Sequence, residues 1–425
     1  MPRLIHDDFL YLLILLCVTL VVSRLFGELF KKFKQPAVVG EILGGVLLGP
    51  SVFKNISPSL FHDLFLSHPN ATMSMDGIFS VALVMLLFIT GMEIELPLIW
   101  RNGRAALFIS LIGMVIPLAI GFGSGWFFYH FFSNGPEDQK TVFALFLGTA
   151  LSITALPVIA KILFDMNLLN SKIGSLIIAC AMLNDFVGWN LFSIVLSMMP
   201  NTNRHIPMLS IWQTALLTIG FAILVLTVVK FFINKSLKFA TAQFKGPGGS
   251  VTIAMAMCFL GAIFTEFVGI HAVFGAFLMG IAFGDSINFQ GRSKDIIHQF
   301  VANIFAPLFF VSIGLKVDFV AHFHLGIVLV VLLISFVAKI AGGYIGGRLG
   351  LLSNRESLAV GFGINARGAM EIVLGLVALQ AGLISDEIFV ALTIMAIVTS
   401  LTSGNFIRYF LGKGAMDSGS NVKIR

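Results

Sequence analysis

The chain has 425 residues, of which 57% are hydrophobic and 11% are charged. Soluble domains carry roughly 25% charged residues, so this composition excludes an ordinary soluble domain and indicates a polytopic membrane protein. The formal net charge of +6 does not indicate nucleic-acid binding, because the basic residues are distributed among loops.

Apolar stretches of about 20 residues, separated by short polar loops, predict an all-α protein whose helices cross the membrane. A transmembrane β-barrel would instead show alternating segments of about 10 residues. The three cysteines, Cys17, Cys180 and Cys258, lie in apolar stretches without CxxC spacing, so neither a disulfide framework nor a zinc site is expected. We expect about 13 spans, at residues 9–30, 37–53, 75–93, 104–130, 142–164, 173–199, 209–233, 249–267, 270–284, 296–315, 324–346, 356–383 and 386–412.

Lysine and arginine are divided unevenly between alternate loops, with about 20 on one side and about 5 on the other. By the positive-inside rule, the amino terminus lies outside and the carboxyl terminus in the cytoplasm. The segment 413–425 is then a short cytoplasmic tail, and we expect no soluble regulatory domain after the last span.

Two pairs of segments suggest an internal repeat. Residues 39–49 resemble 274–284, with three glycines at identical spacing, and residues 88–95 resemble 311–318. These matches equate spans that are seven helices apart, and an odd shift makes the two copies cross the membrane in opposite directions, as in secondary transporters. The sequence therefore predicts a membrane domain over 1–412, with a first repeat at about 9–199, a linker helix at about 209–233 and a second repeat at about 249–412.

The same shift pairs the span at 142–164 with the span at 356–383, and both are interrupted. The first contains Thr154 and Pro157, and the second contains Asn365 and Gly368. Broken helices at corresponding places in two inverted halves indicate a binding site near the membrane midplane, because their exposed backbone ends can face a substrate. The alternative is a pair of packing kinks.

Asn184 and Asp185 are adjacent polar residues within an apolar stretch, Ile173–Met199. A carboxylate at membrane depth is costly and usually handles ions or protons. With hydroxyls and carbonyls nearby, Asp185 could hold either a monovalent cation or a proton, and competition at one carboxylate suffices for exchange. The alternative is a protonated or paired Asp185 that holds helices together. Asn184 supplies a ligand or bonds across helices.

Three further charged residues lie within spans. Lys339 either snorkels to the cytoplasmic interface or is a buried ammonium near the carboxylate. Arg367 and Glu371 are four residues apart on one helix, which favours a structural ion pair that braces the broken helix. Glu41 and Glu266 are given structural roles.

Several motifs together resemble the monovalent cation:proton antiporter superfamily, in the branch of bacterial sodium/proton and potassium-efflux antiporters and plant cation/proton exchangers. The resemblance covers nearly the whole chain. Its motifs are Gln35–Ile42 with Gly49–Ser51, Gly269–Phe277, Phe309–Leu315, Asn184–Asp185 with Trp189, and Asn365–Gly368 with Glu371.

This resemblance implies the sodium/proton antiporter fold, in a homodimer of the bacterial plasma membrane. Each subunit would have a dimerisation domain and a core domain in which two broken helices cross beside the essential carboxylate. Asp185 matches the ion- and proton-binding aspartate, Thr154 the polar position of the first crossing helix, and Lys339 the basic residue facing the site.

The chain departs from electrogenic relatives at one position. Those relatives have a second aspartate, paired with the lysine, where this chain has Asn184. With one titratable acid in the pair, exchange of one Na⁺ or K⁺ for one H⁺ at Asp185 would move no net charge. The sequence therefore predicts electroneutral exchange by alternating access.

Two other kinds of transport protein are alternatives. One is a sodium-coupled organic-anion symporter on a similar repeat scaffold, with Arg367 binding the anion; the other is a cation channel, although no carbonyl-filter motif such as TVGYG is present. An enzyme is not expected, because no nucleophile motif, metal-ligand cluster or phosphate-binding loop stands out, and no cofactor is implied.

Overall fold

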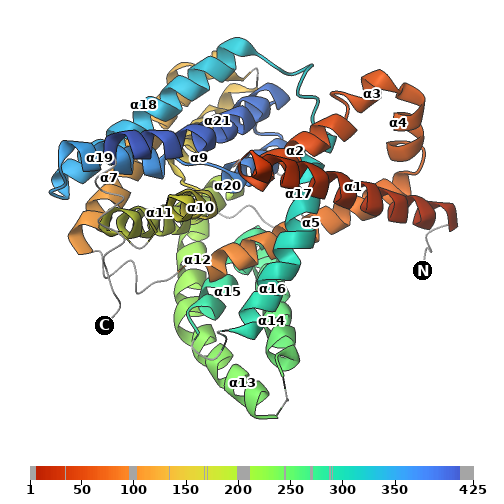
Figure 1. The fold of residues 1–425 in the computed structure, drawn as a ribbon, viewed down its shortest axis with the longest axis horizontal. Helices are drawn as coiled ribbons and strands as arrows, with labels where there is room; N and C mark the ends of the chain where they lie inside the picture. Colours follow the sequence, from red (N-terminus) through yellow and green to blue (C-terminus); the bar gives the residue numbers. More distant parts are fainter. Residues whose placement is uncertain are drawn as a thin grey trace. The chain divides into compact units, whose positions relative to one another are not determined.

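The computed structural model describes residues 6–33, 35–94, 103–133, 135–166, 168–169, 171–198, 211–243, 246–268, 271–286, 289 and 291–411. Every regular element in these ranges is a helix (Figure 1). The expected all-α fold is therefore confirmed. The tail expected at 413–425 lies outside the described residues.

The expected number of about 13 spans is not confirmed. Among the described residues, ten helices are long and apolar enough to cross a membrane, so the protein is an integral, multi-pass membrane protein. The expected spans at 142–164, 270–284 and 356–383 instead consist of shorter helices. The hydropathy pattern makes one span of each of these stretches, whereas the structure divides the first and the third between two helices and gives the second one short helix.

The chain divides into two compact units. Unit 1 comprises residues 1–94 and 219–322, and unit 2 comprises residues 95–218 and 323–425. Helix α12 (Ile211–Leu224) contains one of the boundaries. Each unit therefore combines segments from both halves of the sequence.

Unit 1 contains long helices and short connecting ones. They are α1 (His6–Lys32), α2 (Ala37–Leu48), α3 (Phe53–Ile56), α4 (Pro58–Phe65), α5 (Pro69–Met92), the π-helical turn η2 (Val225–Val229), α13 (Lys230–Gln243), α14 (Gly248–Val268), α15 (Ala272–Gly284), α16 (Arg292–Phe300), the π-helical turn η4 (Val301–Phe305) and α17 (Ala306–Lys316). Helix α1 has acidic residues in its first turn and basic residues in its last, which complements the helix dipole.

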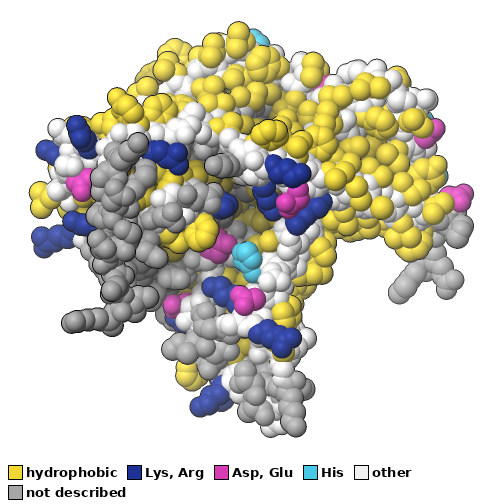
Figure 2. Space-filling view, in the orientation of Figure 1, with side chains coloured by type: hydrophobic (Ala, Val, Ile, Leu, Met, Phe, Trp, Pro, Cys, Tyr) yellow, Lys and Arg dark blue, Asp and Glu magenta, His cyan; other side chains and the backbone are white. Residues whose placement is uncertain are grey.

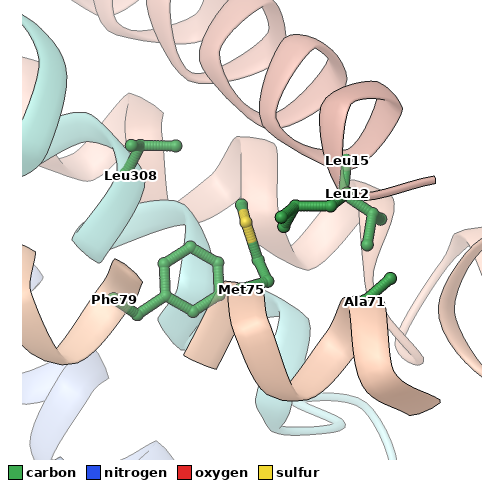
Figure 3. Close-up of a cluster of buried hydrophobic side chains, with 6 residues drawn as sticks. All are labelled: Leu12, Leu15, Ala71, Met75, Phe79 and Leu308. Carbon is green, nitrogen blue, oxygen red and sulfur yellow. The ribbon is translucent and has the colours of Figure 1, made fainter. Parts of the chain in front are cut away.

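A buried hydrophobic cluster joins three helices of unit 1. Helix α1 packs on α2 and α5, and α17 packs on α1, α2 and α5. Figure 3 shows the side chains at the centre of this packing, which are Leu12 and Leu15 from α1, Ala71, Met75 and Phe79 from α5, and Leu308 from α17.

Glycines of the two repeat segments make equivalent contacts in unit 1. A Cβ atom added to Gly45 on α2 would collide with the carbonyl oxygen of Val311 on α17, and one added to Gly280 on α15 would collide with that of Phe88 on α5. In the sequence repeat, Gly45 corresponds to Gly280 and Val311 to Phe88. The helices of each pair therefore touch through their backbones at matching places, and small residues are what allow such close approach.

Unit 2 contains the candidate site. Its helices are α7 (Gly103–Phe127), α8 (Tyr129–Phe132), the 3₁₀ turn η1 (Glu137–Gln139), α9 (Lys140–Ser152), α10 (Leu156–Asp165), α11 (Lys172–Ser197), α18 (Leu325–Leu349), α19 (Asn354–Ile364), α20 (Ala369–Gln380) and α21 (Asp386–Leu411). Helix α18 packs on α7, α19 and α21, while α11 packs on α7, α9, α10 and α19. In the view of Figure 2, hydrophobic side chains dominate the surface over α18 in this unit and over α1 in unit 1, as expected of helices that face lipid.

Both interruptions expected from the sequence are present in unit 2. Helix α9 ends at Ser152 and α10 begins at Leu156, and the residue after α9, Ile153, is extended. Pro157 explains this break, because it has no N–H to donate to the carbonyl of Ile153 and its ring would clash with that carbonyl in a continuous helix. Helix α19 ends at Ile364, and α20 begins four residues after Asn365.

Candidate functional site

Hydrogen bonds join the two breaks of unit 2. The backbone N–H of Ala155 donates to the carbonyl of Ala366 at 3.0 Å. The hydroxyl of Thr154 donates to the carbonyl of Ile364 at 2.7 Å. A Cβ atom added to Gly368 would lie 2.5 Å from the side chain of Val158, so glycine lets the second break approach α10 closely. The two broken helices therefore meet at their interruptions, as the family resemblance implied.

Helix α11 brings Asn184 and Asp185 to the first break. Asp185 is fully buried, and its Oδ2 accepts a long hydrogen bond of 3.4 Å from the N–H of Leu156, the first residue of α10. Asn184 is buried too, and its Nδ2 donates to the hydroxyl of Thr154 at 3.2 Å. The carboxylate thus lies at the positive end of a half-helix, where backbone N–H groups favour negative charge.

Lys339 lies in the interior of unit 2. Its exposed fraction is 0%, and its Nζ donates to the carbonyl of Ser152, the last residue of α9. Of the two positions left open by the sequence, the structure therefore has the buried one. An ammonium at the carboxyl end of a helix satisfies a carbonyl that has no partner within the helix and opposes the negative end of the dipole.

Arg367 and Glu371 form the ion pair expected from their spacing. Nη1 of Arg367 lies 2.8 Å from Oε1 of Glu371, and neither side chain is exposed. The guanidinium also donates to the carbonyls of Ala150 at 2.9 Å and Leu151 at 2.5 Å, both on α9. Oε2 of Glu371 accepts from the N–H of Gly368 at 3.1 Å, just before α20. The pair therefore connects the end of α9 to the start of α20.

The four buried charges match the dipoles of the half-helices. Asp185 and Glu371 accept from backbone N–H groups at the start of α10 and α20. Lys339 and Arg367 donate to the last carbonyls of α9. Burying a single charge costs several kcal/mol, and these helix ends offset part of that cost. With all four groups ionised the set is neutral, so an added cation or proton changes its charge by one.

Two further polar residues, Asn365 and Ser400, lie at this crossing. Asn365, recognised from the sequence only as a position in the break, is fully buried, and neither polar atom of its amide has a hydrogen-bond partner among the described residues. Ser400 on α21 was missed by the sequence reasoning; its hydroxyl donates to the carbonyl of Arg367. A small polar pair, Thr399 and Ser400, within an apolar span was the only sequence signal for it.

The two acids given structural roles lie in unit 1. Glu41 is buried on α2, and a Cβ atom added to Gly27 of α1 would lie 3.2 Å from its Oε1. Glu266 accepts from the N–H of Ala272 at 2.9 Å and so caps the start of α15.

The oxygen atoms at the crossing in unit 2 belong to a carboxylate, a hydroxyl, amides and backbone carbonyls, which are the ligands that hard cations prefer.

A multi-pass membrane protein in which two broken helices cross beside a buried carboxylate has the architecture of a secondary transporter. Residues 16–413 match the family described as sodium/hydrogen exchanger, transmembrane, and the chain belongs to that family. The superfamily recognised from the sequence motifs is thereby confirmed.

Named relatives and solved structures agree with this assignment. Cation/H(+) antiporter 17 of Arabidopsis thaliana is 31% identical over 398 residues, which are 92% of this chain and 47% of the plant protein, so the chain spans about half the length of such relatives. Na(+)/H(+) antiporter NhaS4 of Synechocystis is 28% identical over 94% of this chain and 97% of its own. The sodium proton antiporter MjNhaP1 of Methanocaldococcus jannaschii shares the fold, with a TM-score of 0.65 at 18% identity over 97% of this chain and all of its own.

Proposed function

We propose that this protein exchanges Na⁺ or K⁺ for H⁺ by alternating access, with Asp185 binding the cation and the proton in turn. The observation that carries the proposal is a fully buried carboxylate placed where two broken helices cross. Relatives over most of this chain are named as Na⁺/H⁺, K⁺/H⁺ and cation/H⁺ antiporters, which supports the same class of transport. The chain would accordingly act as a transporter and not as an enzyme.

The bonding of the groups around Asp185 supports exchange of one cation for one proton. Asn184 carries no charge, and Lys339 donates to a backbone carbonyl, that of Ser152. Arg367 is held by Glu371. If only Asp185 changes partner during the cycle, the site has the same charge with a cation as with a proton, and no net charge crosses the membrane.

The geometry argues against the organic-anion symporter. Such a symporter would need Arg367 to bind the anion, but both terminal nitrogens of its guanidinium already donate within the protein, to Ala150, Leu151 and Glu371. An anion would have to compete with a buried carboxylate for the same donors.

Transport by the purified protein in proteoliposomes tests the proposal. Adding Li⁺, Na⁺, K⁺ or Rb⁺ should dissipate an imposed pH gradient, and Asp185→Asn should abolish the response. Asp8→Asn is the matched control, because Asp8 is also a buried aspartate but bonds to Asn70 and His68 in unit 1. A wild-type protein without cation-dependent proton movement, or an active Asp185→Asn variant, would contradict the proposal.

An imposed membrane potential tests the stoichiometry. One charge moved through 100 mV is worth about 2.3 kcal/mol, which is roughly a fifty-fold change in the cation gradient at equilibrium. Electroneutral exchange should show no such change. A steep response to voltage would refute one-for-one exchange while leaving antiport itself intact.

We further propose a homodimer in the bacterial plasma membrane, with the amino terminus outside and the carboxyl terminus in the cytoplasm. The uneven loop charges support this orientation. Val320 and Leu351 lie in exposed loops on the two expected sides. In a Cys17→Ser background, a membrane-impermeant thiol reagent should label Val320→Cys in intact cells and should not label Leu351→Cys. The mass of the detergent-solubilised protein tests the dimer.

A further inference from the structure

Asn365 places at the crossing an amide that has no hydrogen-bond partner among the described residues. Its side chain is fully buried, and both Oδ1 and Nδ2 have no hydrogen-bond partner within the described part of the chain. Nε of the neighbouring Arg367 is in the same condition. Buried polar groups are almost always hydrogen-bonded, so an amide left in this state indicates that another species satisfies it for part of the time.

The backbone on either side of Asn365 fixes its place. The carbonyl of Ile364 accepts from the hydroxyl of Thr154, and the carbonyl of Ala366 accepts from the N–H of Ala155. The next residue after Ala155 is Leu156, whose N–H donates to Asp185. Asn365 therefore lies between the two residues whose carbonyls join the breaks, and one of these carbonyls bonds to the residue that precedes the donor to Asp185.

We propose that Oδ1 of Asn365 is a ligand of the transported cation. The residue would then raise the affinity of the site for the cation relative to its affinity for the proton. The inference rests on the proposed function, in which Asp185 holds that cation. A proton needs a single oxygen of Asp185, whereas a dehydrated Na⁺ or K⁺ needs several oxygens in place of its hydration shell. A neutral amide oxygen supplies such a ligand and leaves the charge of the site unchanged.

Thermal melting of the purified protein separates a ligand from a structural residue. Asn365→Ala removes a polar group that has no hydrogen-bond partner in the described part of the protein, so the variant without cation should melt at the same temperature as wild type or higher. Added Na⁺ or K⁺ should raise the melting temperature of wild type more than that of the variant, with choline as the inert salt. A structural role predicts the opposite pattern, with a lower melting temperature and an undiminished cation effect.

Transport kinetics give the second measurement. Losing a ligand to a charged group should raise the apparent KM for the cation roughly ten-fold or more in Asn365→Ala. Asn365→Ser, which keeps an oxygen, should lie between that variant and wild type. The matched control is Ser357→Ala on α19, the helix that ends just before Asn365. The hydroxyl of Ser357 is also fully buried without a partner among the described residues, but it lies two turns before the break, where a Cβ atom added to Gly347 would come within 2.8 Å of it. The KM of this variant should be unchanged.

The results distinguish failure of the inference from failure of the proposed function. If wild type exchanges ions, Asp185→Asn is inactive and Asn365→Ala keeps the wild-type KM, then only the inference is wrong. An Asn365→Ala protein that cannot be purified in folded form also counts against it, since a partnerless amide should be dispensable for folding. If wild type shows no exchange at all, then the proposed function itself fails.

Discussion

Replacing Glu371 by alanine would measure how much burial contributes to the Arg367–Glu371 pair. The pair is 2.8 Å long, and both side chains have an exposed fraction of 0%. Removing the carboxylate leaves a buried guanidinium without its counter-ion, which costs about 3–5 kcal/mol. Loss of the bond to the N–H of Gly368 adds about 1 kcal/mol, so we expect a destabilisation of roughly 4–6 kcal/mol.

A second Arg–Glu pair provides the comparison. Arg24 and Glu28 have the same residue types and the same spacing, and they lie 3.0 Å apart, but their side chains are 54% and 45% exposed. Glu28→Ala should therefore change the stability very little, because solvent screens an exposed pair. With the unfolding entropy typical of globular proteins, the melting temperature in detergent should fall by about 5 °C for Glu371→Ala, while Glu28→Ala should melt close to wild type.

Equal falls in melting temperature for the two variants would refute this reasoning, because burial would then make no difference. The double variant Arg367→Met with Glu371→Ala gives an independent check. Since it removes the unpaired charge, it should melt above Glu371→Ala alone. Additive losses from the two substitutions would show that the charges do not interact.

Further substitutions test the stoichiometry, the crossing and the repeat. Asn184→Asp adds a second titratable acid, so exchange in proteoliposomes should become voltage-sensitive; an unchanged response would contradict the one-acid argument. Thr154→Val removes the hydroxyl between Ile364 and Asn184 and should cost about 1–3 kcal/mol, seen as a lower melting temperature. Gly45→Ala and Gly280→Ala should each lower the yield of folded protein in gel filtration to a similar extent, while Gly77→Ala, which meets no atom within 4 Å, should be tolerated. If only one of Gly45→Ala and Gly280→Ala is tolerated, the two glycine contacts are not equivalent.

Features with a local physical cause could be predicted from the sequence. Pro157 breaks a helix wherever it stands in the interior, and the first break was therefore found at its actual place. Asp185 stood out because a carboxylate in an apolar span is expensive in any fold. The spacing of Arg367 and Glu371 sufficed for their ion pair, since residues four apart on a helix are neighbours.

Features that depend on distant backbone could not be predicted. Lys339 and Arg367 bond to carbonyls of α9, and a main-chain carbonyl has no signature in the amino-acid sequence. For the same reason the sequence could not decide whether Lys339 snorkels. Nor could it show that the amide of Asn365 has no partner among the residues that the structure describes, because that depends on the packing of distant segments. The number of spans is not confirmed, because the expected spans at 142–164 and 356–383 are each divided between two helices and α15 has only 13 residues. Hydropathy alone does not show where a helix ends.

The matching glycine contacts of unit 1 have a mechanical consequence. Helices that meet through backbone atoms have no side-chain rotamers between them to rearrange, and close-packed atoms are difficult to compress. The pair α2 and α17, like the pair α5 and α15, is therefore stiff against sliding at Gly45 and Gly280. Any change of shape within unit 1 during a transport cycle has to be absorbed by its side-chain contacts or its connecting segments, while each of these two helix pairs moves as one piece.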